Sequence, residues 1–265
     1  MAGRRIAVAA TGPFGADVLE RLAAEHDVVR LLTRPDKPRG RGRRIAPPPA
    51  KEAAERLGIP VAQPQRLDES VELGADTVVV CGYGVLIPNA LLERALWLNV
   101  HPSLLPRWRG AAPVERALMA GDEETGVTIH RAVEALDAGP IAARRAFPVS
   151  PEDDAGAVYA RAAEVSAELL RDVLVQDEPR FEPQPEEDVT YAEKIGPEDR
   201  ELDPDAPAQE LVNRVRALSP HIGARRGDLI VWRARVGEDG SFEPLEVQPA
   251  GGRRMAYDAY LRGRR

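Results

Sequence analysis

Asn99 and His101 lie two residues apart at the end of an apolar run, 96–100, and both have side chains that can move protons or stabilise charge. If the run is a strand, its period of two sends both side chains to the same side. A histidine with a pKa of about 6.5 acts as a general base or acid at neutral pH, and an asparagine amide can donate to a developing oxyanion. The pair suits attack on a carbonyl without a protein nucleophile; a capping asparagine and a structural histidine are the alternative interpretation.

Two other features near this pair could take part in its chemistry. Asp137 stands in a turn, 136–139, where an aspartate usually serves the turn itself. It becomes a catalytic candidate if the fold brings it to Asn99 and His101. Trp108 lies between two arginines at 107 and 109, which could grip an anionic or aromatic ligand or stack on the tryptophan ring.

The elements that must position these residues alternate between strands and helices. Apolar runs at 4–10, 27–33, 76–82 and 96–100 predict strands, and helical spacing predicts helices at 14–25, 50–57 and 87–94. This alternation predicts an α/β fold with a doubly wound, mostly parallel sheet. Ligands of such sheets bind beyond the carboxyl ends of the strands. The loops after residues 10, 82 and 100 are therefore the first places to look for a site.

The second half of the chain predicts a long helix and then a small β domain. A helix is expected at 113–120, strands at 126–133 and 140–149, and an amphipathic helix at 155–175. The segment 176–205 is rich in proline and acidic residues, which is typical of a linker. A helix at 207–218 precedes strands at 228–236 and 245–249, which a glycine-rich turn joins. We expect domains at 1–175 and 206–265.

Composition excludes several classes of protein. The 265 residues include one cysteine and four histidines, which argues against a disulfide framework, a cysteine metal cluster and a zinc site. No apolar run approaches the roughly 20 residues of a membrane helix, and the N-terminus resembles a strand more than a signal peptide. We expect a cytoplasmic protein without a membrane partner. Neither GxGxxG nor a P-loop is present, which disfavours dinucleotide and nucleoside triphosphate binding.

The charge is unevenly distributed along the chain, whose net charge is −7. Residues 30–51 hold eight basic residues against one acidic residue, and residues 214–265 hold eleven against six. Two basic regions in an acidic protein predict contact with a polyanion such as RNA. Solvated faces and a flexible loop are the alternative.

The motifs together resemble a known family. The segment 98–141 contains Asn-x-His-Pro-Ser-Leu-Leu-Pro from Asn99, then Arg-x-Arg-Gly, Thr-Gly-Val-Thr and Leu-Asp-Ala-Gly around Asp137. The basic loop 33–44, the segment 83–88 and Thr-Tyr-Ala-Glu-Lys-Ile at 190–195 fit the same pattern. The pattern, which covers roughly residues 4–218, resembles the formyltransferases that use 10-formyltetrahydrofolate and, among them, the methionyl-tRNA formyltransferases.

This resemblance implies a reaction and a set of site residues. The amine of methionine on initiator Met-tRNA would attack the formyl carbon of 10-formyltetrahydrofolate, a co-substrate, with no metal. Asn99 would stabilise the oxyanion, His101 would stabilise charge or move a proton, and Asp137 would orient His101 and relay a proton through water. The folate-binding residues implied are Tyr83, Gly84, Leu86, Ile87, Pro88, Ser103, Leu104, Leu105 and Pro106. The tRNA-binding residues implied are Arg39, Arg41, Arg43 and Arg44.

The resemblance also assigns the parts of the chain and leaves alternatives open. It makes 1–175 the catalytic domain, 176–205 a linker and 206–265 an OB-like tRNA-binding domain, here shortened because the turn at 237–240 replaces expected barrel strands. A shortened domain is also compatible with a formyltransferase for a small amine, such as an amino sugar nucleotide. A folate- or RNA-binding protein without catalytic activity is the alternative from another class. We expect a monomer.

Overall fold

The computed structural model describes residues 3–39 and 44–263, without the side chain of Arg39. The chain forms two compact units. The first contains residues 1–109, 126–146 and 160–190, and the second contains 110–125, 147–159 and 191–265. None of the helices in the described residues has both the length and the apolar character that crossing a bilayer requires.

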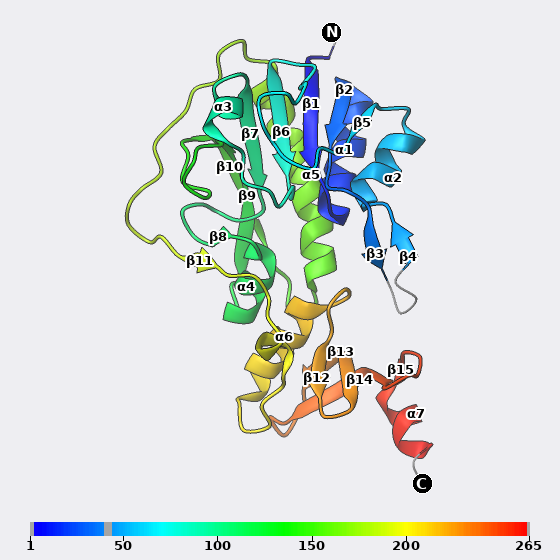
Figure 1. Cartoon of the computed structure of the whole chain (residues 1–265). Coiled ribbons are helices and arrows are strands. Elements are labelled where there is room, and N and C mark those ends of the chain that lie inside the picture. Colours follow the sequence, from blue (N-terminus) through cyan, green and yellow to red (C-terminus); the bar gives the residue numbers. More distant parts are fainter. Residues whose placement is uncertain (1–2, 40–43, 264–265) are drawn as a thin grey trace. The chain divides into compact units, whose positions relative to one another are not determined.

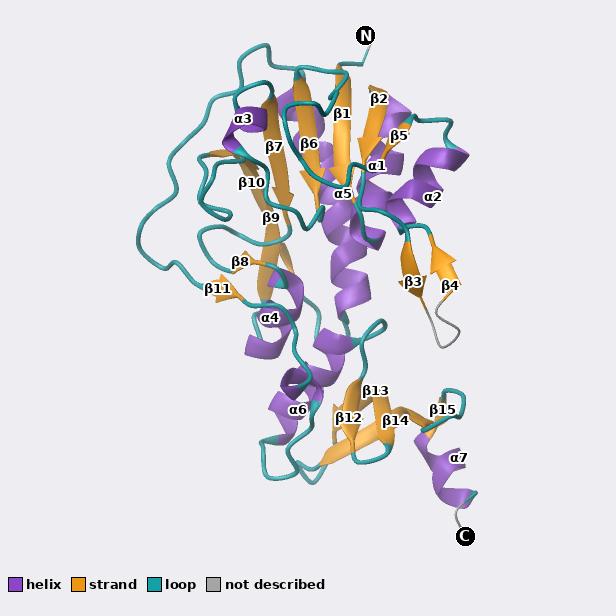
Figure 2. Cartoon of the chain, in the orientation of Figure 1, coloured by secondary structure: helices purple, strands orange, loops and turns teal. Residues whose placement is uncertain are grey.

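The first unit is built on a seven-stranded sheet (Figures 1 and 2) with the order β10-β9-β7-β6-β1-β2-β5. Strands β2, β1, β6 and β7 run parallel, and β9 runs antiparallel to β7. The predicted α/β fold with a mostly parallel sheet is therefore confirmed. The strands are β1 (Arg5–Ala10), β2 (Asp27–Leu32), β5 (Val61–Ala62), β6 (Thr77–Cys81), β7 (Leu96–His101), β9 (Glu124–Arg131) and β10 (Ile141–Pro148).

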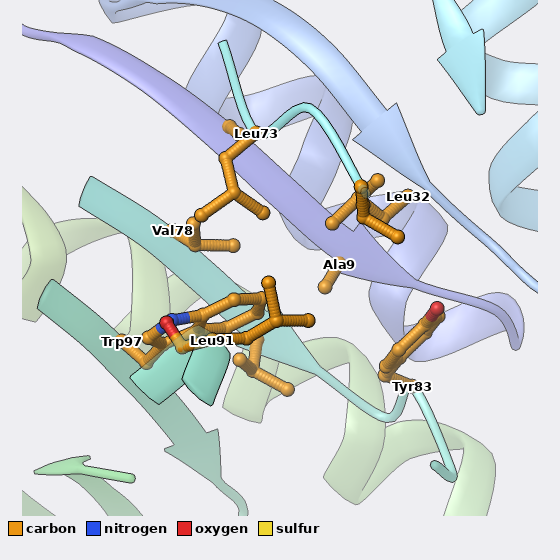
Figure 3. Close-up of a cluster of buried hydrophobic side chains, with 10 residues drawn as sticks. Ala9, Leu32, Leu73, Val78, Tyr83, Leu91 and Trp97 are labelled. Carbon is orange, nitrogen blue, oxygen red and sulfur yellow. The ribbon is translucent and has the colours of Figure 1, made fainter. Parts of the chain in front are cut away.

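Buried residues on alternate positions of the strands form the core on one face of this sheet. Ala9 of β1 and Val78 of β6 contact Leu91 and Trp97 in a cluster (Figure 3) that also contains Tyr83. The indole nitrogen of Trp97 donates to the carbonyl oxygen of Leu91 over 2.7 Å, so even the polar atom of this large side chain is satisfied.

Helices connect the strands, and three of those described begin at a proline. They are α1 (Pro13–Glu25), α2 (Pro49–Arg56), α3 (Asn89–Leu92), α4 (Pro113–Ala120), α5 (Ala155–Leu174), α6 (Ala208–Leu218) and α7 (Tyr257–Arg262), with a 3₁₀ turn at Glu198–Arg200. Proline opens α1, α2 and α4, because its missing N–H costs nothing in the first turn. In α1, a Cβ atom on Gly15 would lie 2.5 Å from the carbonyl oxygen of Cys81. Glycine therefore lets α1 approach the ends of β1 and β6.

The segment named as the basic loop, 33–44, is partly strand. β3 (Lys37–Arg39) and β4 (Arg44–Ala46) pair antiparallel, with Lys37 opposite Ala46 and Arg39 opposite Arg44. Each strand has three residues, Lys-Pro-Arg and Arg-Ile-Ala, which are too few to show an alternation of apolar residues in the sequence. The hairpin stands between β2 and α2.

The second unit contains a four-stranded antiparallel sheet of β12 (Ala224–Arg226), β13 (Leu229–Val236), β14 (Phe242–Pro249) and β15 (Met255–Ala256), in that order. Val231 and Val247 of the sheet pack on Leu211 and Leu218 of α6. The two strands predicted here and the small β domain are confirmed, and the turn at 237–240 closes the β13–β14 hairpin. The proposed division at 175 and 206 stays a prediction.

Candidate active site

Asn99 and His101 lie in the C-terminal half of β7, and Asp137 lies in the loop between β9 and β10. The amide nitrogen of Asn99 donates to Oδ1 of Asp137 over 2.9 Å. Nδ1 of His101 lies 3.6 Å from Oδ2 of the same carboxylate. His101 and Asp137 are 4% and 8% exposed. The fold therefore brings together the three residues that the sequence separates by 38 positions.

His130 is a fourth member of this cluster, and the sequence analysis missed it. It lies opposite Asn99 in the pairing of β9 with β7, and its side chain is buried. Nε2 of His130 is 2.9 Å from the amide nitrogen of Asn99, and Nδ1 is 3.1 Å from the carbonyl oxygen of Arg131. A carbonyl only accepts, so Nδ1 carries the proton and Nε2 accepts from Asn99.

The amide of Asn99 consequently donates both of its hydrogens inside the cluster. One goes to the carboxylate of Asp137 and the other to the ring of His130. This assigns the orientation of the amide, because its oxygen would face two acceptors if it were turned around. An N–H of Asn99 reaches an external acceptor only by leaving one of these two partners.

The ring of His101 is fixed by a backbone carbonyl. Its Nε2 donates to the carbonyl oxygen of Trp108 over 2.7 Å. Burial lowers the pKa of His101, and the nearby carboxylate of Asp137 opposes that effect. The neutral ring therefore keeps its proton on Nε2, and Nδ1, which faces Asp137, is the nitrogen that can accept a proton.

The loop that presents the Trp108 carbonyl is held at several points. Trp108 has a φ of 63°, an unusual conformation for a large side chain. Its N–H donates to Oγ1 of Thr190 over 2.8 Å, and the N–H of Arg109 donates to the carbonyl oxygen of Thr190 over 2.9 Å. The guanidinium of Arg107 stacks on the Trp108 ring, 4.4 Å from its centre. The stacking alternative thus describes Arg107.

Residues 103–106 precede this loop, and hydrogen bonds fix their backbone. The hydroxyl of Ser103 donates to the carbonyl oxygen of Arg107 over 2.7 Å, and Thr128 donates to the carbonyl oxygen of Ser103 over 2.7 Å. Ser103, Leu105 and Pro106 are buried, whereas Leu104 is half-buried. The buried side chains shape the loop, and Leu104 is the one that offers surface to a ligand.

The segment 83–88 leaves the sheet at the same edge. β6 and β7 are parallel neighbours with Val80 opposite Asn99. Tyr83 is buried in the core cluster (Figure 3), and its carbonyl oxygen accepts a hydrogen bond of 2.9 Å from Thr11. The residues after it, Gly84, Leu86, Ile87 and Pro88, are exposed or half-buried. This segment therefore offers an apolar surface through Leu86, which is 75% exposed.

Two of the four arginines of the basic loop, Arg41 and Arg43, lie outside the described residues. Arg39 ends β3, and Arg44 begins β4 with an exposed side chain. The described part of the loop places these two opposite each other in the hairpin. Within the described residues, no group of three histidine, cysteine, aspartate or glutamate side chains is arranged to hold a metal ion.

Comparison with known proteins places this arrangement in context. Residues 4–174 match the formyl transferase family model. The methionyl-tRNA formyltransferase of Halorhodospira halophila is 41% identical and aligns over 98% of this chain and 96% of its own length. That of Listeria monocytogenes serotype 4a is 36% identical over 96% of this chain and 93% of its own length. The Halorhodospira alignment spans 303 positions against 265 residues here, so that relative carries segments that this chain lacks.

Solved structures share the fold. A methionyl-tRNA formyltransferase from Clostridium thermocellum has a TM-score of 0.63 at 16% identity, covering 94% of this chain and 99% of its own. An N-formyltransferase from Helicobacter canadensis, solved with folinic acid and dTDP-3-aminofucose, has a TM-score of 0.67 at 16% identity, covering 97% and 99%. At such identities the likeness concerns the fold alone.

Proposed function

The chain belongs to the formyltransferase family, and from that premise we propose that it transfers the formyl group of 10-formyltetrahydrofolate to the α-amino group of methionine on initiator Met-tRNA. The observation that carries this proposal is the similarity to methionyl-tRNA formyltransferases over nearly the full length of both chains. The cluster of Asn99, His101 and Asp137 supports it, because these residues suit attack on a carbonyl carbon.

The reaction replaces one carbon–nitrogen bond with another. The amine nitrogen of methionine bonds to the formyl carbon, and the bond from that carbon to the folate nitrogen breaks. The amine loses a proton and the folate nitrogen gains one. Between these events the formyl oxygen carries a negative charge, which the protein has to stabilise.

We assign the catalytic roles to the cluster at the end of β7. One N–H of Asn99 turns from its internal acceptor to the formyl oxygen as that oxygen becomes charged. Nδ1 of His101 takes the amine proton, since Nε2 is held by the carbonyl of Trp108. The carboxylate of Asp137 stabilises the imidazolium that results. A positioned base contributes about 10²–10⁴-fold to the rate, and an oxyanion donor contributes about 10²–10³-fold.

The folate and tRNA sites follow from the surfaces beside this cluster. The exposed part of the segment 83–88 and Leu104 are proposed to contact the folate. Arg39, Arg41, Arg43 and Arg44 are proposed to contact the tRNA. In the second unit, Arg226, Arg253 and Arg254 are exposed cations that suit contacts with phosphates. We propose that the protein acts as a cytoplasmic monomer.

The test is formyl transfer from 10-formyltetrahydrofolate to initiator Met-tRNA, with elongator Met-tRNA and an amino sugar nucleotide as parallel acceptors. Rapid transfer to the initiator tRNA, weakened steeply by salt, is expected because a tRNA contact releases counterions. Transfer to the amino sugar nucleotide alone would replace this function with that of a small-amine formyltransferase. A folded protein that binds folate but formylates no acceptor would refute the assignment as an enzyme.

A further inference from the structure

Gln184 belongs to the segment between α5 and β11 (Tyr191–Ala192), which composition predicts to be a linker (Figure 1). Its amide nitrogen donates to the carbonyl oxygens of Asp137 and Gly139 over 2.7 and 2.8 Å. Its amide oxygen accepts from Nε and Nη2 of Arg109 over 3.0 and 2.6 Å. Both hydrogens of the amide and its oxygen are therefore engaged.

The segment around Gln184 is fixed to the first unit before it reaches the site. Glu182 and Ile141 exchange two backbone hydrogen bonds, over 2.7 and 2.9 Å. Gln184 follows two residues later, and Arg109 braces it from the opposite side. The side-chain amide therefore has a defined place from which to hold the loop 137–139.

The loop it holds has little room to shift without a change of geometry. Asp137 has a φ of 48°, in the left-handed region that aspartate adopts more readily than most residues other than glycine. A Cβ atom on Gly139 would lie 1.7 Å from the carbonyl oxygen of Arg131, so the loop passes very close to the end of β9. The carbonyls of Asp137 and Gly139 both face Gln184. The same residue, Asp137, directs its carboxylate to Asn99 and His101.

We propose that Gln184 is a positioning residue for the reaction: its two N–H groups hold the backbone of Asp137 so that the carboxylate stays between Asn99 and His101. This inference rests on the proposed function for its effect on the rate. It assigns a role in the site to part of the segment 176–205, which connects the helix α5 to β11.

Gln184→Glu is the sharpest test. The variant has nearly the same shape and keeps an oxygen for Arg109, but it removes both N–H donors and turns an oxygen toward two carbonyls. We expect kcat to fall by about 10²-fold, as a misplacement of about 1 Å can cause, with the Kd for folate unchanged. The melting temperature should fall as well, because the carbonyl oxygens of Asp137 and Gly139 both lose their donor, so turnover is measured well below the melting transition.

The pH dependence separates positioning from a general structural role. The carboxylate of Asp137 raises the pKa of His101 against the effect of burial. In Gln184→Met, which removes both N–H donors without adding a charge beside the site, displacement of Asp137 lets the pKa of His101 fall, and the acid limb of the kcat profile moves to lower pH. Gln176→Glu is the matched control for Gln184→Glu, because it makes the same chemical change at an exposed residue that donates to the carbonyl oxygen of Asp172. It should leave both kcat and the profile unchanged.

Two results would overturn the inference. One is wild-type turnover by Gln184→Glu, and the other is an equal loss of turnover and folate binding with no movement of the acid limb in Gln184→Met. If the wild-type protein itself transfers no formyl group, the proposed function fails separately. The titration of the His101 ring by NMR then decides about Gln184: a lower titration point in the uncharged variant Gln184→Met supports positioning, and an identical one refutes it.

Discussion

Replacing Asn99 with alanine should damage both stability and catalysis, by amounts that the hydrogen bonds of its amide determine. The amide donates over 2.9 Å to Oδ1 of Asp137 and over 2.9 Å to Nε2 of His130. Both acceptors are buried side chains. Asn99→Ala takes this donor from each of them, and a buried polar group that loses its partner costs about 1–3 kcal/mol. We therefore expect the free energy of unfolding to fall by about 2–6 kcal/mol.

The effect on the rate is separate from this loss. As the donor to the oxyanion, Asn99 should contribute about 10²–10³-fold to kcat. Formyl transfer has to be measured well below the melting transition of the variant, whose midpoint should drop by about 2–4 °C for each kcal/mol lost. Thermal unfolding gives the first quantity, and single-turnover transfer to initiator Met-tRNA gives the second.

A stability control makes the comparison decisive. Asn213 is a buried asparagine in α6 whose side-chain oxygen accepts from Gln209 over 2.9 Å. Asn213→Ala should lower the melting temperature while keeping the wild-type turnover, since that residue lies in the second unit and outside the cluster. If Asn99→Ala turns over at a near wild-type rate, Asn99 does not stabilise the transition state. If its melting temperature equals that of the wild type, the two hydrogen bonds do not hold the cluster as described.

Three further predictions concern other parts of the chain. Thr190→Val removes the acceptor of the Trp108 N–H, so kcat should fall about tenfold or more as the His101 ring loses its fixed partner; Thr190→Ser should restore it, and equal rates for both variants would refute the role. Arg41→Ala and Arg44→Ala should each weaken the use of Met-tRNA and lower the salt dependence without changing folate binding; an equal loss of both activities would mean that the loop serves the whole site. Neither ring nitrogen of His26 has a hydrogen-bond partner among the described residues, and burial lowers its pKa from 6.5. The unfolded chain therefore binds this proton at a higher pH than the folded one, and stability should decline as the pH falls below about 6.5; melting curves of His26→Gln should show a shallower decline, and an identical slope would contradict the assignment.

The central sheet could be predicted because its signal is local. The strand Thr77–Cys81 is buried at every residue, and its sequence is accordingly one threonine, three valines and one cysteine. The hairpin β3–β4 could not, because its strands are Lys-Pro-Arg and Arg-Ile-Ala, three residues each, and Lys37, Pro38, Arg44 and Ile45 are exposed. The short strands β5, β12 and β15 were missed as well, since two or three residues are too few to show a period.

Only the part of the candidate site that residue type and spacing mark could be predicted from the sequence. Asn99 and His101 share a strand, so the period of two relates them, whereas Asp137 needed either the fold or a family resemblance. His130 stands two residues after Thr128 on β9, in antiparallel register with Asn99. That register depends on the pairing of two segments distant in the sequence, and the sequence itself showed only that 126–133 alternates like a strand. Gln184 and Thr190 act through contacts 47 and 82 positions away, which no local pattern encodes.

The two hydrogen bonds that the Asn99 amide donates explain what His130 contributes to the proposed reaction. A neutral formyl oxygen in the bound substrate competes poorly for an N–H that already has a good partner, whereas the charged oxygen of the tetrahedral intermediate accepts a bond roughly twice as strong as a neutral one. Of the two internal acceptors, the carboxylate of Asp137 is the stronger and the neutral ring nitrogen of His130 the weaker. We therefore expect the N–H that bonds to His130 to be the one that turns toward the oxyanion, and to do so only when charge has developed. An exchange of this kind favours the transition state over the bound substrate, which is the condition for raising kcat.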